Sequence, residues 1–417
     1  MALNMPIYDS FLENYYREYP MSEWMFNQAS PLVSNLKKRK TGGKQVVQPV
    51  LYGLPQGRSR NFTVADTKAK KGDFVAGEVT FKLDKDYSIF RVDGQVIAAS
   101  ELRPYSFAKA LETQSNLQLK TLINNRCTAI YGNGTGSRAT VNVIDTSADK
   151  RSFTVNERAF HMNIGKGMEI QFSSATSGGS LRTGTYTVDA IDRTGQTITV
   201  TSDLDAGIAK GDHIFANGDY IASGSTDFIM DGLESFAPDV VAGTDNFRGL
   251  NRSKDRERLA GTIFTQSSNT TLEETILDAC AELGQNGGMI DCLYMNPLDF
   301  NDFVQELGSR VRYNRDELRK TPIGRVGFQY LEINTAGAKG GMAKVYSDPY
   351  CPLKRIWGLD MSMPEIYYLG ESFIHLDKID GNRYLRDLGG DEVQGRHKSY
   401  ANLHLPRPVD LLKINLK

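Results

Sequence analysis

Phosphate binding is the first chemistry that residue spacing could support here, because two stretches are rich in glycine. GNGTGSR spans residues 132–138 and GAKGGMAK spans residues 337–344. A phosphate cradle needs GxxxxGK followed by Ser or Thr, in a loop that leads from a strand into a helix. Neither stretch has that spacing, and the first follows a predicted helix. Neither stretch therefore predicts a nucleotide site.

Acid–base, nucleophilic or metal chemistry would need histidine, cysteine or carboxylate side chains at defined spacings. His161, His213 and His397 lie in predicted strands or loops, and none has a ligand partner four residues further on. The sequence contains no HExxH helix and no GxSxG elbow. The cysteines have no CxxC spacing and are interpreted as buried free thiols: Cys127, Cys280, Cys292 and Cys351. We assign no catalytic, cofactor-binding or metal-binding residue. This favours a structural role without excluding an enzyme, because active sites assemble from distant parts of a chain.

Composition indicates a soluble, globular chain of two or three domains. It has 417 residues, of which 40% are hydrophobic and 24% are charged. No apolar run approaches the roughly 18 residues that a membrane helix needs, and the N-terminus has no signal-peptide pattern. The formal net charge is −1, so the total shows no basic footprint of tight nucleic-acid binding.

The longest helical pattern runs from Pro104 to Gly132. Apolar or small residues recur there at three- and four-residue steps, which predicts one buried helical face. Pro104 suits a first helical turn, and the glycines from Gly132 onward end the pattern. Such a helix would be roughly 40 Å long at 1.5 Å per residue. We interpret it as a spine along which the rest of the chain is laid out.

Before this spine, the sequence predicts an arm and an extended loop. Residues 1–42 form the arm, whose aromatic residues we expect to dock on a neighbouring molecule: Tyr15, Tyr16, Tyr19 and Trp24. The arm ends in a basic run at residues 37–40, which we interpret as a solvated turn. Residues 43–92 predict strands at 44–52 and 79–92. The segment between them is rich in Gly, Lys and Ser and should be mobile or held by another subunit.

The spine belongs to a predicted unit at residues 93–138. Beyond it, the sequence pattern becomes one of short strands. Alternating patterns separated by turns over residues 139–220 predict a small β-barrel or sandwich. Residues 221–268 look irregular. A helix, strand, helix and further strands at 269–363 predict an α/β domain, and residues 364–417 return to strands. The fold class is therefore α+β.

This order of parts resembles the major capsid protein of tailed bacteriophages, which has the Hong Kong 97 fold. KQVVQPVLYG resembles the first strand of the extended loop, and PYSFAKALETQSNLQLKTLINNRCTAIYGNG resembles the spine helix. IGKGMEIQF and RTGTYTVDAIDRTGQTITV resemble the β domain inserted in some members. DGLESFAPD, FRGLNRS and SYANLHLPRP add to a match that covers nearly the whole chain. The family has peripheral and axial domains, which the resemblance places at residues 93–138 with 364–417 and at 269–363.

The resemblance implies a head protein that assembles as hexamers and pentamers into an icosahedral shell around double-stranded DNA. The strand that begins the extended loop starts within 45 residues of Met1, which leaves no room for a scaffold segment. A separate scaffolding protein, or none, is then expected, with portal and decoration proteins as further partners. The virion would be its location, after assembly in the host cytoplasm. The near-neutral charge predicts weak, non-specific contact with the packaged DNA.

In this family the extended loop lies across the adjacent subunit, which implies the contact residues. We expect them to be the charged and apolar residues of that loop: Arg58, Arg60, Phe62, Val64, Lys68, Lys70, Lys71 and Phe74. Some members weld subunits by an isopeptide bond from a loop lysine. No short motif here marks the partner asparagine or the catalytic acid, so we predict no cross-link.

Two other functions remain open from the sequence. The first is a cellular nanocompartment shell of the same fold, although such shells are usually shorter and lack a β insertion. The second is an intracellular multidomain enzyme that uses the β domain as a binding module. A Ser–His or paired-carboxylate site in the α/β domain would favour the enzyme.

Overall fold

The structure is a computed structural model that describes residues 30–54, 57–71, 75–95, 104–145, 150–156, 164–192, 194–222, 229–240, 243, 245–308, 331–377, 384–386 and 390–417. The side chains of residues 71, 75 and 104–113 are not described. The arm residues Tyr15, Tyr16, Tyr19 and Trp24, the loop residue Phe74 and His161 fall outside these ranges.

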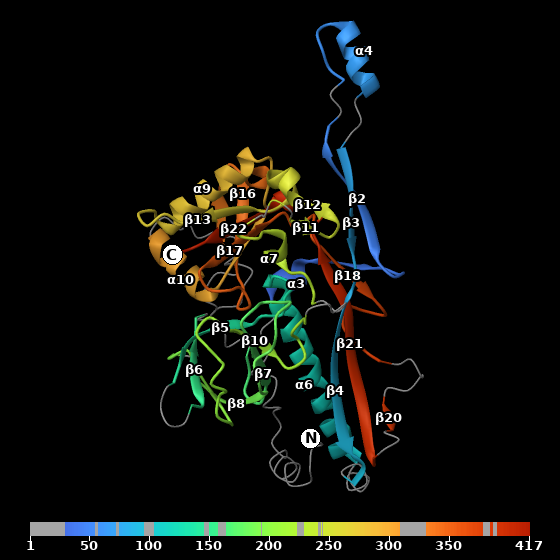
Figure 1. Ribbon diagram of the computed structural model, residues 1–417, viewed down its shortest axis with the longest axis vertical. Helices are drawn as coiled ribbons and strands as arrows, with labels where there is room; N and C mark the ends of the chain where they lie inside the picture. The colour runs from blue at the N-terminus through green and yellow to red at the C-terminus, as the bar shows by residue number, and fades with distance from the viewer. Residues whose placement is uncertain are drawn as a thin grey trace, which may run out of the picture.

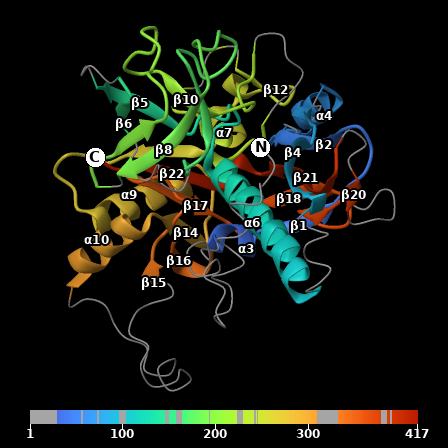
Figure 2. The ribbon, with the colours of Figure 1, turned by 90° about the horizontal axis from the view of Figure 1, so that it is seen from below.

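The predicted spine is one continuous helix, α6, which spans Pro104–Tyr131. It packs beside a sheet in the order β1 (Lys37–Lys40), β18 (Glu365–Leu369), β21 (Glu392–His404) and β19 (His375–Leu376). β4 (Asp84–Asp93) and β20 (Leu385–Arg386) also pair with β21. Figure 2 shows α6 running beside this sheet. Alternate residues of β4 are buried, as expected for a strand with one covered face.

Two strands of this sheet correct the sequence analysis. The basic run 37–40 is not a solvated turn but an edge strand, β1, which pairs in parallel with β18 while its side chains stay exposed. Lysine on an edge strand discourages pairing with other chains. β4 was expected in the extended loop, but it pairs with β21 from Asp84 to Asp93. Both segments pair with strands that lie far away in the sequence, so local patterns could not predict either pairing.

The extended loop is a two-stranded hairpin that projects from the body. β2 (Val46–Gly53) pairs antiparallel with β3 (Val75–Phe81), and α4 (Phe62–Lys71) lies at the tip. Figure 1 shows the hairpin rising above the body, almost in line with β4 and β21. The sequence analysis did not predict α4. Its local signals are short-range: Asn61 caps the Thr63 amide, and Lys70 pairs with Asp66 one turn earlier.

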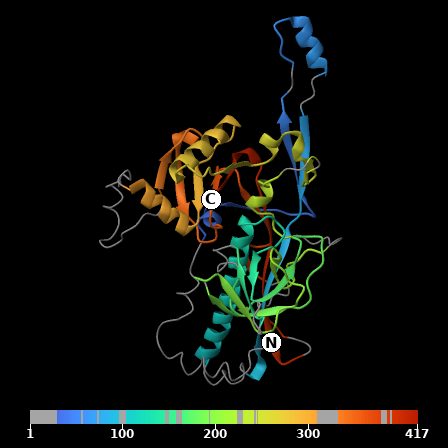
Figure 3. The same ribbon diagram turned by 60° about the vertical axis from the view of Figure 1, so that its left-hand side comes forward.

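Residues 139–216 form a closed β-barrel, as the sequence predicted. Its strands follow the order β10 (His213–Ala216), β5 (Ala139–Ile144), β6 (Ser152–Val155), β9 (Thr197–Val200), β8 (Tyr186–Asp192) and β7 (Glu169–Ser173). The barrel has its own apolar core, in which Phe172 lies edge-on to Phe153 and Tyr186. Figure 3 brings this barrel forward, with α6 behind it.

The α/β domain contains a mixed sheet in the order β13 (Thr262–Thr265), β22 (Leu411–Asn415), β17 (Arg355–Leu359), β14 (Cys292–Met295), β16 (Met342–Ser347) and β15 (Leu331–Asn334). α9 (Leu272–Gln285) begins with a capping box between Thr271 and Glu274, and α10 (Pro297–Leu307) has Pro297 in its first turn. The sequence analysis placed β13 and β22 outside residues 269–363. Both pair within this sheet instead.

Short elements fill the junction between the two sheets. They are α3 (Pro31–Asn35), α7 (Leu233–Phe236), β11 (Asn246–Phe247), β12 (Leu250–Asn251), η2 (Arg252–Lys254), α8 (Arg256–Leu259), η4 (Lys339–Gly341) and η5 (Pro408–Asp410). A single apolar core joins α6, α7 and both sheets, with Trp357 and Tyr131 among its largest members. Within the described residues, no helix combines the length and apolar character needed to cross a bilayer.

Candidate functional site

The projecting hairpin presents apolar side chains to solvent. Phe62 is 85% exposed, Leu54 is 77% exposed and Leu51 is 68% exposed, with Val47 and Val64 also exposed. Val47 and Leu51 lie on β2, and Phe62 and Val64 lie on α4, so several exposed apolar residues belong to the one projecting segment. A two-stranded ribbon of this kind is also marginally stable by itself in water. These exposed residues make the hairpin the candidate contact surface of the chain.

The predicted basic contact residues lie in the same region. Arg58 and Arg60 lead into α4, and Lys68 and Lys70 lie on it; all four are exposed. Lys70 donates to Asp66 of the same helix at 2.6 Å, so it already has an ion-pair partner within the subunit. Lys71 closes α4. The structure thus brings Phe62, Val64 and these basic residues together at the tip.

The hairpin is fastened to the segment from β11 to α8, both near its root at Thr80 and farther along its strands at Tyr52 and Gly77. Arg258 donates from Nη1 to the Tyr52 carbonyl at 2.8 Å, and the Thr80 amide donates to the Arg248 carbonyl at 2.9 Å. Gly77 lies against Leu250, and a side chain at Gly77 would clash with that leucine. Most of the length of β2 and β3 is therefore held to the body, and the segment beyond them, which carries α4, projects (Figure 1).

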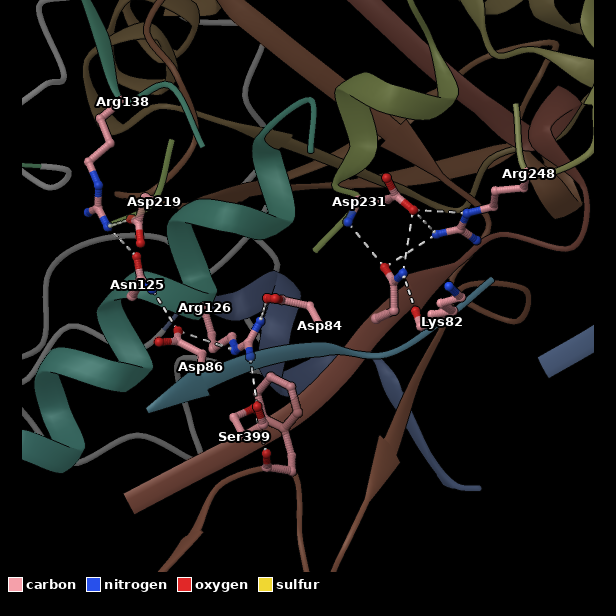
Figure 4. A network of polar contacts seen from close by, with 12 residues as sticks. Lys82, Asp84, Asp86, Asn125, Arg126, Arg138, Asp219, Asp231, Arg248 and Ser399 are labelled. Carbon is pink, nitrogen blue, oxygen red and sulfur yellow. Dashed lines mark hydrogen bonds and ion pairs between the residues drawn. The ribbon is translucent and has the colours of Figure 1, made fainter. Parts of the chain in front are cut away.

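Arg248 is the centre of one buried cluster at this root (Figure 4). Its guanidinium carbon lies 4.6 Å from the ring centre of Phe81, 4.8 Å from that of Phe236 and 5.2 Å from that of Phe247. It pairs with Asp231 at 2.7 Å and donates to the Leu403 carbonyl at 2.7 Å. Burial lowers the pKa of Arg248, and the Asp231 carboxylate opposes that shift.

Two residues of β21 complete this cluster. Asn402 donates to the Lys82 carbonyl at 2.8 Å and accepts from the Asp231 amide at 3.1 Å. His404 lies 3.2 Å from Arg248 through Nδ1, which must be the acceptor because arginine only donates. Burial, together with the nearby Arg248 cation, lowers the pKa of His404 to about 3. His404 is therefore neutral at ordinary pH.

A second buried arginine holds the same segment from the α6 side. Arg126 pairs with Asp84, lies 3.5 Å from Asp86 and donates to the Ser399 carbonyl at 2.9 Å. Burial raises the pKa values of Asp84 and Asp86, and the Arg126 cation works against both shifts. Residues 82–86, which lead from the hairpin into β4, are thus held by Asn402 and Arg126 from different elements (Figure 4).

The barrel joins the same network where the chain enters and leaves it, since Arg138 precedes β5 and Asp219 follows β10. Arg138 pairs with Asp219 at 3.0 Å and donates to the Asn125 side chain, while Asn125 donates to Asp86 at 2.6 Å. Figure 4 shows these residues bridging from the barrel to α6 and β4. The polar network therefore links the barrel to α6 and to the start of β4.

Asp348 anchors the segment that follows the predicted arm. This fully buried carboxylate accepts from the Ser30 hydroxyl, from the Tyr131 hydroxyl at 2.8 Å and from the Tyr350 amide at 2.9 Å. The chain thus leaves residue 30 from a fixed point between α6 and the α/β domain. The four aromatic arm residues lie outside the description, and their docking on a neighbour stays a prediction.

Among the described residues, Ser115 and Ser137 each lie within hydrogen-bond distance of a histidine ring. Ser115 lies 3.0 Å from Nε2 of His397, and Ser137 lies 3.2 Å from Nδ1 of His213. Among the described groups, Nδ1 of His397 has no hydrogen-bond partner, so no carboxylate orients that ring. Both pairs lie outside the α/β domain. The described residues also contain no cluster of three metal-ligating side chains.

The four cysteines are buried free thiols, as predicted. Burial raises the pKa of Cys127 and of Cys292 to about 12 each and that of Cys280 to about 11, and it also raises the pKa of Cys351 well above its ordinary value. A thiol with so high a pKa is a poor nucleophile at neutral pH.

Sequence reasoning missed Arg126, Arg248 and Asp348, which organise the root and the arm anchor. A charged residue in a sequence is normally interpreted as a surface residue, because few are fully buried. The one available signal was the aromatic setting of Arg248 in NFRGLNRS, where Phe247 precedes it.

Comparison of the fold with solved structures identifies its type. A chain in the capsid of cyanophage A-1(L) matches with a TM-score of 0.53 and 12% identity, covering 96% of this chain and 96% of that one. This confirms the resemblance to phage capsid proteins at the level of the fold. No family model and no curated protein sequence matches the chain.

Two further matches are weaker. A structure from Gordonia phage Cozz has a TM-score of 0.45 and 9% identity, covering 100% of this chain and 95% of that one. The SrpI encapsulin of Synechococcus elongatus PCC 7942 also has a TM-score of 0.45 and 9% identity, covering 100% and 96%. Scores below 0.5 carry no argument about this chain.

Proposed function

We propose that this chain is the major capsid protein of a tailed bacteriophage, with the Hong Kong 97 fold and an inserted barrel. Copies assemble as hexamers and pentamers into an icosahedral shell that encloses double-stranded DNA. The proposal assigns the chain no enzymatic activity, no cofactor and no membrane contact. It locates the protein in the virion, after assembly in the host cytoplasm.

The observation that carries the proposal is the hairpin that projects beyond its own body with exposed apolar residues. Phe62, Leu54 and Leu51 gain little inside the subunit, since each is more than 60% exposed. A ring-closing, heterologous contact would bury them on the next subunit, and the same contact repeats around a closed shell. The fold shared with a cyanophage capsid chain supports the same assignment.

The contact residues divide into apolar anchors and basic guides. Phe62 and Val64 would be buried on the neighbour, with Phe74 as a further anchor. Arg58, Arg60, Lys68 and Lys71 would meet acidic groups there and fix register more than affinity. The arm residues Tyr15, Tyr16, Tyr19 and Trp24 would add a second contact. Scaffolding, portal and decoration proteins are the expected partners of the assembled shell.

Contact with the enclosed DNA should be weak and independent of sequence. The formal net charge of −1 provides little counterion release on binding to phosphates. We expect free subunits not to shift a duplex in a gel at physiological salt. Tight binding under those conditions would contradict this part of the proposal.

Negative-stain microscopy of the purified chain tests the function. We expect closed particles of uniform size, with or without added crowding agent or salt. Particles from the natural source should protect DNA from nuclease. Particles that instead enclose a protein cargo and no protected DNA would favour a nanocompartment shell. A monomer or dimer under every assembly condition would contradict a shell protein and would favour the multidomain enzyme.

A further inference from the structure

The turn that carries Arg248 is an unusual place for an arginine. β11 and β12 form a small hairpin in which Phe247 pairs with Leu250, so Arg248 and Gly249 are its two loop residues. Both have positive φ angles, 53° at Arg248 and 88° at Gly249. Two-residue turns of this kind favour Asn, Asp or Gly at the first position, because other side chains are strained there. Arginine is the wrong choice for the turn alone.

What the arginine gains in this position is contact with the root of the large hairpin. Its carbonyl accepts from the Thr80 amide, and its guanidinium lies against the ring of Phe81, the last residue of β3. Gly249 approaches the Glu78 carbonyl and the Thr80 hydroxyl, so the whole turn lies along β3. One residue therefore touches the hairpin with both its backbone and its side chain.

The other end of the guanidinium is fixed to the body. It pairs with Asp231 and donates to the carbonyl of Leu403 on β21. Residues 82 and 83, which belong to no strand, follow immediately after Phe81. A change of direction between hairpin and body would fall at these two residues, unless the contacts on either side hold them.

We propose that Arg248 is the positioning residue that fixes the direction in which the hairpin leaves the body. The angle at which one subunit reaches the next then depends on this side chain. The inference about assembly rests on the proposed shell function, whereas the inference about hairpin direction can be tested on the free subunit.

The chain offers a close control in Arg252. This residue is also buried, lies over the same Phe247 ring at 4.4 Å and pairs with Asp245 at 2.8 Å. It donates to the Ser235 carbonyl at 2.6 Å. Its recorded contacts include no residue of the hairpin. A general loss of buried charge should therefore affect both arginines, but a loss of positioning should affect only Arg248.

The first experiment measures the hairpin direction by pulsed electron paramagnetic resonance in unassembled subunits. Spin labels are placed at Ala76→Cys on β3 and Asp278→Cys on α9, both exposed. The native cysteines are all buried, so the two new thiols are labelled selectively. R248N is the informative variant, since asparagine suits the turn. It also takes the cation from Asp231, and R252N matches this loss by taking the cation from Asp245.

We expect R248N to widen the distance distribution at least two-fold, while R252N leaves the width unchanged. F81L should widen it as well, because it removes the ring from the hairpin side and keeps an apolar residue. An unchanged width in R248N, or equal widening in R252N, would overturn the proposal. Unchanged hydrogen exchange in the barrel verifies that each variant is folded.

The second experiment measures particles formed by unlabelled protein. We expect R248N to lower the yield of uniform particles at least ten-fold and R252N to stay within two-fold of the parent. Uniform particles in normal yield from R248N would refute the link from hairpin direction to assembly. If the parent itself forms no particles, the proposed function fails while the resonance measurement still decides the role of Arg248.

Discussion

Replacement of Phe62 by serine should weaken assembly without weakening the subunit. Full burial of a phenylalanine contributes roughly 1.5–3 kcal/mol. The side chain is 85% exposed in the subunit, so nearly all of that contribution is available to a partner. We take about 2 kcal/mol per subunit as the loss in F62S. Because 1.4 kcal/mol corresponds to a factor of ten, the protein concentration needed for half-assembly should rise roughly 30-fold.

Light scattering across a concentration series, with microscopy of the products, measures this shift. Thermal unfolding of the unassembled subunit should be unchanged, since an exposed side chain adds little to its stability. V143S is a matched control, because Val143 is 54% exposed on the barrel, away from the hairpin. We expect it to assemble like the parent. An unchanged assembly concentration for F62S would refute the assignment of Phe62 as an anchor, and a large drop in subunit melting temperature would show that it packs internally.

Four further outcomes are expected. Deletion of residues 58–74 should leave folded subunits that form no stable particles, and in the intact chain the amides of α4 should exchange fast in subunits and slowly in shells; equal exchange would mean that the hairpin tip is ordered by its own body. R126M should lower the free energy of unfolding by about 3–5 kcal/mol in denaturant titrations, because it leaves Asp84 buried without its cation, whereas R91M at a half-exposed pair should cost less than about 1 kcal/mol. His404 has a pKa of about 3 in the folded chain, below its ordinary value. Between about pH 6.5 and 3 only the unfolded chain therefore takes up a proton at this residue. The free energy of unfolding then falls as pH falls, by about 1.4 kcal/mol per pH unit. The difference in unfolding free energy between H404N and the parent should therefore move in favour of H404N by about 2–3 kcal/mol from pH 7 to pH 4.5, and a constant difference would contradict the buried neutral histidine. Denaturing gels of mature particles should show a single monomer band, and a ladder would reveal the cross-link that the sequence does not predict.

The parts predicted well from the sequence are those fixed by local patterns. The spine was predicted at 104–132 and spans Pro104–Tyr131, because its apolar spacing, its first-turn proline and its terminal glycine agree. The barrel strands were predicted because each alternates and is bounded by turn residues. A first helix was predicted in residues 269–363, and the capping box at Thr271 with its acidic first turn is the local signal for α9.

What could not be predicted depends on distant partners. β22 has an ordinary strand pattern, and only the folded sheet shows that it lies between β13 and β17. Arg248 and Arg126 carry no sequence mark of burial, since the groups that neutralise them lie far away in the chain. The tip helix α4 was missed because its few apolar residues face solvent and give no buried stripe. The loop contact residues therefore stay a prediction from the sequence and its resemblance, and the buried residues that hold the hairpin could not be predicted from the sequence.

The position of β22 has a consequence for the order in which the chain becomes competent during synthesis. β13 ends at residue 265 and β22 begins at residue 411, which is 146 residues later (411 − 265). At about 5–20 residues per second, a ribosome needs roughly 7–30 s to cover that distance. Throughout this interval β13 lacks its partner β22, and β17 lacks it too once residues 355–359 have been made. The hairpin with its exposed Phe62 has been synthesised before either. A nascent chain can therefore expose the hairpin to a neighbour before it can complete its own α/β domain. Chains that terminate early would carry the exposed apolar hairpin without a complete α/β domain.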